Sequence, residues 1–180
     1  MTIEPCARLS PTRIVERGEI SRRKVKAIIA NLSPKIGQRE IETALRRLNW
    51  DAGCAEIVET RNSVGPGNIV LIETETTTGI TEVFCGFGRL GTSAESVAAE
   101  AAAEARTYIA SEGAVGEHLA DQLLLPFGLA GGGEFTATKL NRHALTNIEV
   151  VSSFLPVRFT TAKEAGYTRV RITSDSKQAS

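Results

Sequence analysis

Apolar and polar residues alternate along the first half of the chain in a way that predicts a small βαβββ unit over roughly residues 17–90. Residues 18–32 combine this alternation with β-branched side chains and end at Ser33-Pro34, which is typical of a strand. The next stretch, "IGQREIETALRRLNW", has apolar residues at helical spacing. A short strand, "CAEIVETR", and a hairpin that turns through "TTTG" complete the predicted unit.

The pattern changes after residue 91 and predicts the order α-α-β-α-β-β for the remainder. An alanine-rich helix, "TSAESVAAEAAAEARTYIASEG", is followed by a second helix within "AVGEHLADQLLLPFGLAGGG". "EFTATKL" alternates as a strand, "HALTNIEVVSSFLP" is a third helix, and residues 157–173 form a terminal hairpin that turns at Ala165-Gly166. We expect an α+β fold with its helices on one face of a sheet.

The order of these elements indicates that the first unit is an insertion. The alanine-rich helix has no strand ahead of it except through the βαβββ unit, so we expect the strand that pairs with the second half of the chain to lie before this unit, in "MTIEPCARLS". The expected division is therefore residues 1–16 and 92–174 in one domain, 17–91 as the insert, and 175–180 as a disordered tail.

Composition is typical of a soluble globular protein. The 180 residues are 42% hydrophobic and 23% charged, and no apolar run reaches the roughly 18 residues of a membrane span. We find no signal peptide. The cysteines Cys6, Cys54 and Cys85 lack CxxC spacing, so reduced thiols in a cytoplasmic protein fit better than disulfides or zinc.

The net charge of zero hides an asymmetry between the two ends of the chain. Residues 1–50 carry eleven Lys or Arg against five Asp or Glu, and residues 51–180 carry ten against sixteen. Such a basic end can attract a polyanion, and it is also typical of an ordinary solvated face. The feature alone does not choose between these interpretations.

One predicted helix carries a stripe of polar residues. Glu117, His118, Asp121 and Gln122 share one side or its edge, because they are spaced by three or four positions. The stripe is compatible with a purine or metal-phosphate pocket and equally with a hydrated helix face. His118 and Asp121 together with His143 are a weak candidate set of metal ligands, because their spacing is generic.

The glycine run in "AGGGEF" is not a phosphate-binding loop. No strand leads into it, no Lys-Ser/Thr follows it, and GxGxxG is absent. We interpret it as the end of a helix and a closely packed start of a strand.

His143 is the candidate nucleophile. It lies at the start of a predicted helix, where free backbone N–H groups and the helix dipole favour an anion. A neutral imidazole at that position could attack phosphorus or act as a general base, and neighbouring Arg142 could bind the same phosphate. A histidine in a first turn is also often a cap or a core residue, so position alone leaves both roles open.

Four ordered motifs resemble one known family. "GEHLADQLLLP", "GGGEF", "HALTNIEV" and "FLPVRF" are similar to the C-terminal core of the RNA 3′-terminal phosphate cyclases, and "GPGNIVLIETET" and "RLGTSAESVAAEAAAEARTYIAS" extend the similarity upstream. The resemblance covers about Glu16 to Ile172. It implies repeated βαβαββ units with a small α/β insert domain, of which this chain would be the C-terminal part.

The resemblance also implies an activity. Family members use ATP and a divalent cation, Mg or Mn, to adenylylate a histidine that matches His143. The AMP passes to an RNA 3′-phosphate, and a 2′,3′-cyclic phosphate forms. The stretch His118-Leu119-Ala120-Asp121-Gln122 matches the nucleotide-contacting segment of the family. The implied substrate is an RNA 3′-phosphate end, and neither a membrane nor DNA is expected.

The chain departs from the family pattern in its length. Family members are longer, and their N-terminal repeats and glycine-rich motif have no counterpart here. We expect a C-terminal fragment that has little or no cyclase activity without a missing N-terminal half. A non-catalytic cyclase-like protein that binds RNA or acts in ribosome assembly, and an inactive remnant, remain as alternatives. Leu123, Leu124, Leu125 and Phe127 are expected to be exposed for lack of partners.

Overall fold

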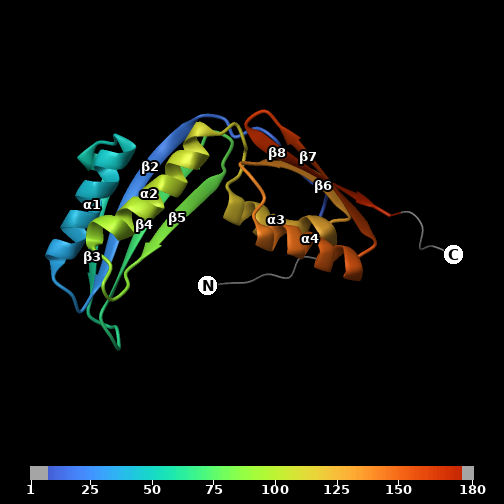
Figure 1. Cartoon of the computed structure of the whole chain (residues 1–180). Helices are drawn as coiled ribbons and strands as arrows, with labels where there is room; N and C mark the ends of the chain where they lie inside the picture. The colour runs from blue at the N-terminus through green and yellow to red at the C-terminus, as the bar shows by residue number, and fades with distance from the viewer. Residues whose placement is uncertain (1–7, 176–180) are drawn as a thin grey trace. The chain divides into compact units, whose positions relative to one another are not determined.

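The computed structural model describes residues 8–175, which divide into two compact units (Figure 1). Residues 18–110 form one unit, here called the inserted unit. The flanking unit is formed by the chain on either side of it, up to residue 17 and from residue 111. Cys6 and the expected disordered tail, apart from Asp175, lie outside the described residues.

The inserted unit is a four-stranded sheet with two helices. The strand order is β3-β2-β4-β5, with β3 parallel to β2 and the other pairs antiparallel. Gly79, with a φ of +82°, closes the β4–β5 turn within the predicted "TTTG" segment. The predicted βαβββ order is confirmed. The elements are β2 (Ile20–Ala30), α1 (Pro34–Leu48), the short helix η1 (Ala52–Cys54), β3 (Ala55–Thr60), β4 (Gly67–Thr76), β5 (Thr81–Phe87) and α2 (Ala94–Ala110).

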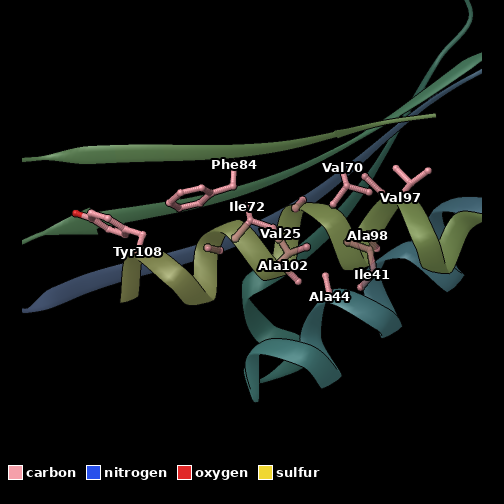
Figure 2. Close-up of a cluster of buried hydrophobic side chains, with 13 residues drawn as sticks. Val25, Ile41, Ala44, Val70, Ile72, Phe84, Val97, Ala98, Ala102 and Tyr108 are labelled. Carbon is pink, nitrogen blue, oxygen red and sulfur yellow. The ribbon is translucent and has the colours of Figure 1, made fainter. Parts of the chain in front are cut away.

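The core of the inserted unit lies between its sheet and its helices (Figure 2). Small residues on α2 let this helix approach both α1 and the sheet closely, and Tyr108 packs against Phe84 with ring centroids 5.6 Å apart. Val97 and Tyr108 of α2 are fully buried, as are four of its alanines, Ala98, Ala101, Ala102 and Ala105. The single tryptophan, Trp50, packs against the edge of this core.

Helix α2 places the domain boundary later than expected from the sequence. The expected boundary was residue 91, but α2 begins at Ala94 and belongs to the inserted unit, which ends at Ala110. The buried alanines of α2 pack in the core of this unit. In addition, Arg39 of α1 donates two hydrogen bonds of 2.7 Å to Glu95 of α2. The change of composition after residue 91 marks a change of element type, and the change of unit comes one helix later.

The flanking unit is also a four-stranded sheet with two helices. Its strand order is β1-β6-β8-β7. Strand β1 pairs in parallel with β6, with Thr12 opposite Gly133 and Ile14 opposite Phe135, so a strand that precedes the insert belongs to this sheet, although residues 1–7 of the segment expected to form it lie outside the described residues. It lies at residues 12–14, just after the predicted "MTIEPCARLS". The elements are β1 (Thr12–Ile14), α3 (Glu117–Leu129), β6 (Gly132–Ala137), α4 (Arg142–Phe154), β7 (Val157–Glu164) and β8 (Tyr167–Ser174).

Helices α3 and α4 lie side by side on one face of this sheet (Figure 1). Phe127 of α3 packs edge-on against Phe135 of β6, with ring centroids 5.4 Å apart. Gly133 has a φ of +139°, and a Cβ there would lie 2.5 Å from the Phe127 ring, so the glycine run allows this close packing. Leu124 and Phe127 are buried, contrary to the expectation that they would be exposed.

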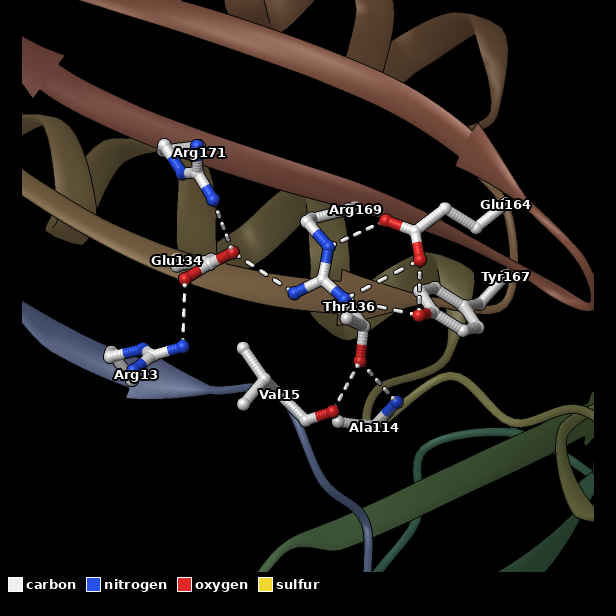
Figure 3. Close-up of polar contacts among 9 residues, drawn as sticks. All are labelled: Arg13, Val15, Ala114, Glu134, Thr136, Glu164, Tyr167, Arg169 and Arg171. Atoms are coloured by element: carbon white, nitrogen blue, oxygen red, sulfur yellow. Dashed lines mark hydrogen bonds and ion pairs between the residues drawn. The ribbon is translucent and has the colours of Figure 1, made fainter.

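The sheet of the flanking unit carries an ionic cluster centred on Glu134 (Figure 3). The Oε1 atom of Glu134 accepts hydrogen bonds from Arg169 at 3.0 Å and Arg171 at 3.1 Å, and Oε2 pairs with Arg13 at 3.1 Å. Arg169 also donates to Glu164 at 2.6 Å. One carboxylate therefore ties together strands β1, β6 and β8.

Candidate active site

The site is built where two parallel helices begin. Asp121 in the first turns of α3 contacts His143 in the first turn of α4. Near the other end of α3, a Cβ on Gly128 would lie 2.9 Å from Val151, so a glycine is needed where the helices approach closely. Because α3 and α4 run in the same direction, their N-terminal ends, which carry partial positive charge, lie together.

The start of α4 is set by Asn141. Its side-chain Oδ1 accepts a hydrogen bond of 2.8 Å from the backbone N–H of Ala144, which is a typical N-cap. This cap puts His143 at the second position of the helix. The remaining free N–H groups of the first turn lie near the imidazole, in an arrangement that favours a bound phosphate.

His143 and Asp121 form a hydrogen-bonded pair. The distance between His143 Nδ1 and Asp121 Oδ2 is 2.8 Å. The side chain of Asp121 is 19% exposed, whereas that of His143 is 79% exposed. Since an ionised carboxylate only accepts hydrogen bonds, Nδ1 carries the proton in this pair. In the neutral imidazole the lone pair is then on Nε2, which is the tautomer that a nucleophile or general base requires.

Asn147 fixes the carboxylate that orients this histidine. Its Nδ2 atom donates to Oδ1 of Asp121 at 3.2 Å. Asn147 lies one turn after His143 on α4, so both residues contact the same side of α3. Their spacing of four positions could have identified Asn147 from the sequence as a partner in the site.

A second ion pair lies at the start of α3. Lys139, in the loop after β6, is 2.8 Å from Oε2 of Glu117. His118 is exposed, and its Nε2 is 3.8 Å from the other oxygen of Glu117. Lys139 was not among the sequence candidates, because its contact depends on the path of the chain after β6 and no spacing rule indicates it.

The predicted nucleotide-contacting stretch divides between site and core. Asp121 is in the site, and His118 and Gln122 are exposed beside it. Leu119 is half-buried, and Ala120 is fully buried, so the side chain of Ala120 packs in the core. The polar residues His118, Asp121 and Gln122 therefore lie outside the core.

The described part of the chain holds no group of three His, Cys, Asp or Glu side chains placed to bind a metal ion. The weak candidate set of His118, Asp121 and His143 therefore does not converge. Both carboxylates of the site already have partners, Lys139 for Glu117 and His143 with Asn147 for Asp121. A protein-held cation does not fit these residues, whereas a phosphate group fits the paired helix ends.

Other features of the described residues limit the chemistry. Cys54 and Cys85 are free thiols, and burial raises the pKa of both, so neither is an activated nucleophile. None of the helices between residues 8 and 175 is long and apolar enough to cross a bilayer.

The fold and the site define an α+β protein with a histidine–aspartate pair at two adjoining helix N-termini. Residues 15–110 match the family described as RNA 3′-terminal phosphate cyclase (RTC), insert domain. This match covers more than half of the chain and the whole inserted unit. The chain belongs to the RNA 3′-terminal phosphate cyclase family.

Similarity to individual relatives extends over both units. The RNA 3′-terminal phosphate cyclase of Koribacter versatilis (strain Ellin345) is 45% identical over 172 residues, which cover 96% of this chain and 48% of the relative. The protein of the same name from Salmonella enteritidis PT4 is 44% identical over 166 residues. That from Ralstonia nicotianae is 40% identical over 172 residues. The chain spans about half the length of the curated relatives it matches.

Proposed function

We propose that His143 accepts the adenylyl group of ATP in the conversion of an RNA 3′-phosphate to a 2′,3′-cyclic phosphate. The observation that carries this proposal is the hydrogen bond of 2.8 Å between Asp121 Oδ2 and His143 Nδ1. It leaves the Nε2 lone pair on an imidazole that is 79% exposed. Family membership supports the RNA 3′-phosphate as the substrate, because the relatives are named for it.

The steps follow from the chemistry of an exposed imidazole. Nε2 of His143 attacks the α-phosphorus, an N–P bond forms, and the bond to pyrophosphate breaks. An oxygen of the RNA 3′-phosphate then displaces His143 from the AMP phosphorus. The RNA 2′-hydroxyl finally attacks the activated 3′-phosphate, loses its proton and releases AMP. Each step replaces one bond to phosphorus by another, so no oxidant or reductant is required.

The residues around His143 have separate roles in this proposal. Asp121 is a positioning residue that holds the ring and balances the charge when Nε2 forms its bond to phosphorus. Asn147 in turn holds the carboxylate of Asp121. The N–H groups at the start of α4 offset the negative charge of the phosphate. A divalent cation, Mg or Mn, would come with the phosphates of ATP and reduce their charge.

The presence of His143 favours this function over a non-catalytic cyclase-like role in RNA binding or ribosome assembly. A purely binding protein has no need for an ionised carboxylate that selects the nucleophilic tautomer. Because the chain spans about half the length of its relatives, we propose that turnover requires the N-terminal half of a cyclase, and that the 180 residues alone show little of it.

The test is covalent labelling with ATP that carries the label on its α-phosphate, with Mg or Mn, followed by a denaturing gel. The reaction is run on the chain alone and with the N-terminal half of the Koribacter relative. We expect an acid-labile, alkali-stable label that His143→Ala abolishes and Asp121→Asn lowers at least about tenfold. Glu149→Gln is the matched control and should retain the label, because Glu149 is exposed on α4 and is not part of the Asp121–His143 pair.

Two results would contradict the proposal. One is a label that persists in the His143→Ala variant. The other is the absence of label on the wild-type chain even when the N-terminal half is supplied and circular dichroism shows a folded protein.

A further inference from the structure

The sheet of the flanking unit carries four arginines on the face that lies away from its helices. Successive side chains of a strand point to opposite faces, so the buried Val170 of β8 faces α3 and α4, and its neighbours Arg169 and Arg171 face away. The strand register places Arg13 of β1 and Arg158 of β7 on the same face. We call Arg13, Arg158, Arg169 and Arg171 the arginine face.

The cations of this face are exposed, and the carboxylate between them is not (Figure 3). The side chains of Arg13, Arg158 and Arg171 are 70%, 71% and 59% exposed, whereas that of Glu134 is 10% exposed. Arg13 and Arg171 each reach Glu134 through one nitrogen, Nη2, and Arg158 is 4.0 Å from Asp175. A guanidinium has five N–H donors, so each of these arginines can bond a phosphate oxygen at the same time.

The basic residues near the start of the sequence do not form such a surface on the sheet of the inserted unit. Lys24 and Lys26 of β2 both pair with Glu56 of β3, at 3.0 Å and 3.3 Å. Glu56 is more exposed than either lysine, and Arg22 lies 3.7 Å from Glu75. Carboxylates therefore offset the cations at the surface of that sheet, whereas the arginines are outermost on the sheet of the flanking unit.

A single-stranded polyanion fits the composition of the arginine face. Thr160 and Thr173 lie exposed on the same face, and threonine hydroxyls are common partners of phosphate oxygens. The strands β1, β6, β7 and β8 carry no exposed large hydrophobic side chain along their described lengths. A protein partner would need an apolar centre in the surface that it covers, and this face has none.

The arginine face begins at the end of the sheet that leads to the candidate site. Thr136, next to the last residue of β6, lies opposite Arg169. Residues 138–141 then connect β6 to α4, which carries His143 in its first turn. From Arg169 the face continues along β8 to Arg171, two residues or roughly 7 Å further. A strand whose 3′ end lies at His143 can therefore pass the end of the sheet and follow these arginines.

We infer that the arginine face binds the phosphates of a single-stranded RNA on the 5′ side of its 3′-phosphate end. The inference rests on the proposed function, which supplies RNA as the occupant. Because the contacts are to phosphates and not to bases, the affinity depends on salt and little on base sequence. Binding is measured without ATP, so the test is independent of the adenylylation of His143.

The probe is a fluorescent oligouridine that ends in a 3′-phosphate, and its anisotropy is followed with the 180-residue chain at several salt concentrations. We expect the double variant Arg158→Gln with Arg171→Gln to bind at least about tenfold more weakly. Each phosphate contact of a single strand contributes about 0.7 to the slope of log K against log salt, so this slope should fall by about 1.4. Arg13 and Arg169 still pair with Glu134 in this variant, and hydrogen exchange of β6 and β8 verifies its fold.

Matched variants separate charge on this face from other effects. Arg46→Gln with Arg47→Gln removes the same charge from two exposed residues of α1 and should leave the affinity unchanged. Arg158→Lys with Arg171→Lys keeps the charge and should bind within about threefold of the wild type, because lysine also binds phosphate. The loss in the glutamine variant should be the same for an RNA that ends in a 3′-hydroxyl, because the arginines contact the strand and not its end.

Undiminished RNA affinity in the glutamine variant of Arg158 and Arg171, or no RNA binding by the wild-type chain at low salt, would overturn the inference. An equal loss in the variant of Arg46 and Arg47 would place the RNA on the inserted unit instead. An equal loss in the lysine variant would show that structure and not charge is responsible, and a loss confined to the 3′-phosphate RNA would place the arginines at the terminal phosphate. Both results also overturn it. Failure of ATP labelling with intact RNA binding would count against the proposed function alone.

Discussion

The two units use the same architecture and differ in how completely their helices are buried. Each has a four-stranded sheet and two helices. In the inserted unit, α2 contributes a row of fully buried alanines to a shared core with α1. In the flanking unit, α3 and α4 keep five large apolar side chains exposed to solvent, namely Leu125, Leu129, Leu145, Val150 and Phe154.

The two helix layers therefore differ in how much apolar surface they leave in contact with water. The exposed large hydrophobic residues of the inserted unit lie on strands and in loops, and its helices have none. Its helix layer therefore leaves no large apolar side chain exposed to solvent. The flanking unit holds the candidate site, and its two helices leave a further apolar surface exposed.

The largest effect should come from placing the same charge in each helix layer. Ala102→Asp buries a carboxylate at a position with no exposure, so we expect the inserted unit to lose more than about 4 kcal/mol of unfolding free energy. Phe154→Asp alters a side chain that is 82% exposed, so the flanking unit should lose less than about 1 kcal/mol.

The fluorescence of Trp50 measures the effect of Ala102→Asp on the inserted unit directly. It is the only tryptophan and packs on the core of the inserted unit, so urea unfolding followed by its fluorescence reports that unit. Hydrogen exchange of β6 and β8 reports the flanking unit. Comparable losses of unfolding free energy in Ala102→Asp and Phe154→Asp would show that the two helix layers do not differ in this way.

The sequence predicted the elements well because their signals are local. Periodicity and turn residues identified the four α-helices and the strands from β2 onward, including the hairpin closed by Gly79, whereas β1 lies outside the segment expected for it and η1 was not predicted. The boundary at residue 91 was misplaced, because the alanine pattern that makes α2 a helix says nothing about which sheet it packs on. The expectation that Leu124 and Phe127 would be exposed was wrong for a similar reason, since the side of α3 that meets the sheet depends on tertiary packing.

The candidate site was only partly predictable. His143 and Asp121 were each identified, His143 from its place at a helix start and both from family resemblance. Their hydrogen bond joins residues 22 positions apart on different helices, and no spacing rule links them. The sequence grouped Asp121 with His118 on one helix stripe, and with both histidines only as a weak set of metal ligands, whereas the structure pairs it with His143 by a hydrogen bond. Lys139 has no sequence signal at all, because only the path after β6 brings it to Glu117.

Glu134 in the flanking unit and Glu40 in the inserted unit compare the electrostatics of the two units. Substitution of Glu134 should change the unfolding free energy more. Hydrogen bonds from Arg169, and then from Arg171, lower the pKa of Glu134 below its usual 4.5. A pKa lowered by folding stabilises the protein above the unfolded value and ceases to do so as pH falls through the folded value. Glu134→Gln should therefore cost the flanking unit about 1–2 kcal/mol at pH 7 and much less at pH 3.

Hydrogen exchange of β6 and β8, corrected for the intrinsic rate at each pH, measures this difference. Glu149→Gln on the exposed side of α4 is the matched control and should have no effect at either pH. A cost for Glu134→Gln that is equal at pH 7 and pH 3 would show that the charge of Glu134 is not what holds β1, β6 and β8 together.

Glu40 in the inserted unit should behave in the opposite way, with the smallest effect. It is fully buried, Asn68 donates a hydrogen bond to one of its oxygens, and burial raises its pKa. A carboxyl pKa raised by folding contributes stability below the unfolded value, which is lost as pH rises through the folded value. Glu40→Gln keeps the acceptor for Asn68 and removes the charge. We therefore expect the unfolding free energy of this variant to rise relative to that of the wild type by less than about 1 kcal/mol between pH 4 and pH 7.5, measured by Trp50 fluorescence in urea.

The control is Glu42→Gln, because Glu42 lies two positions further along α1 and is exposed, so its substitution should show no such rise. A Glu40→Gln variant that loses stability relative to the wild type as pH rises would mean that the buried carboxylate is stabilised in its charged form.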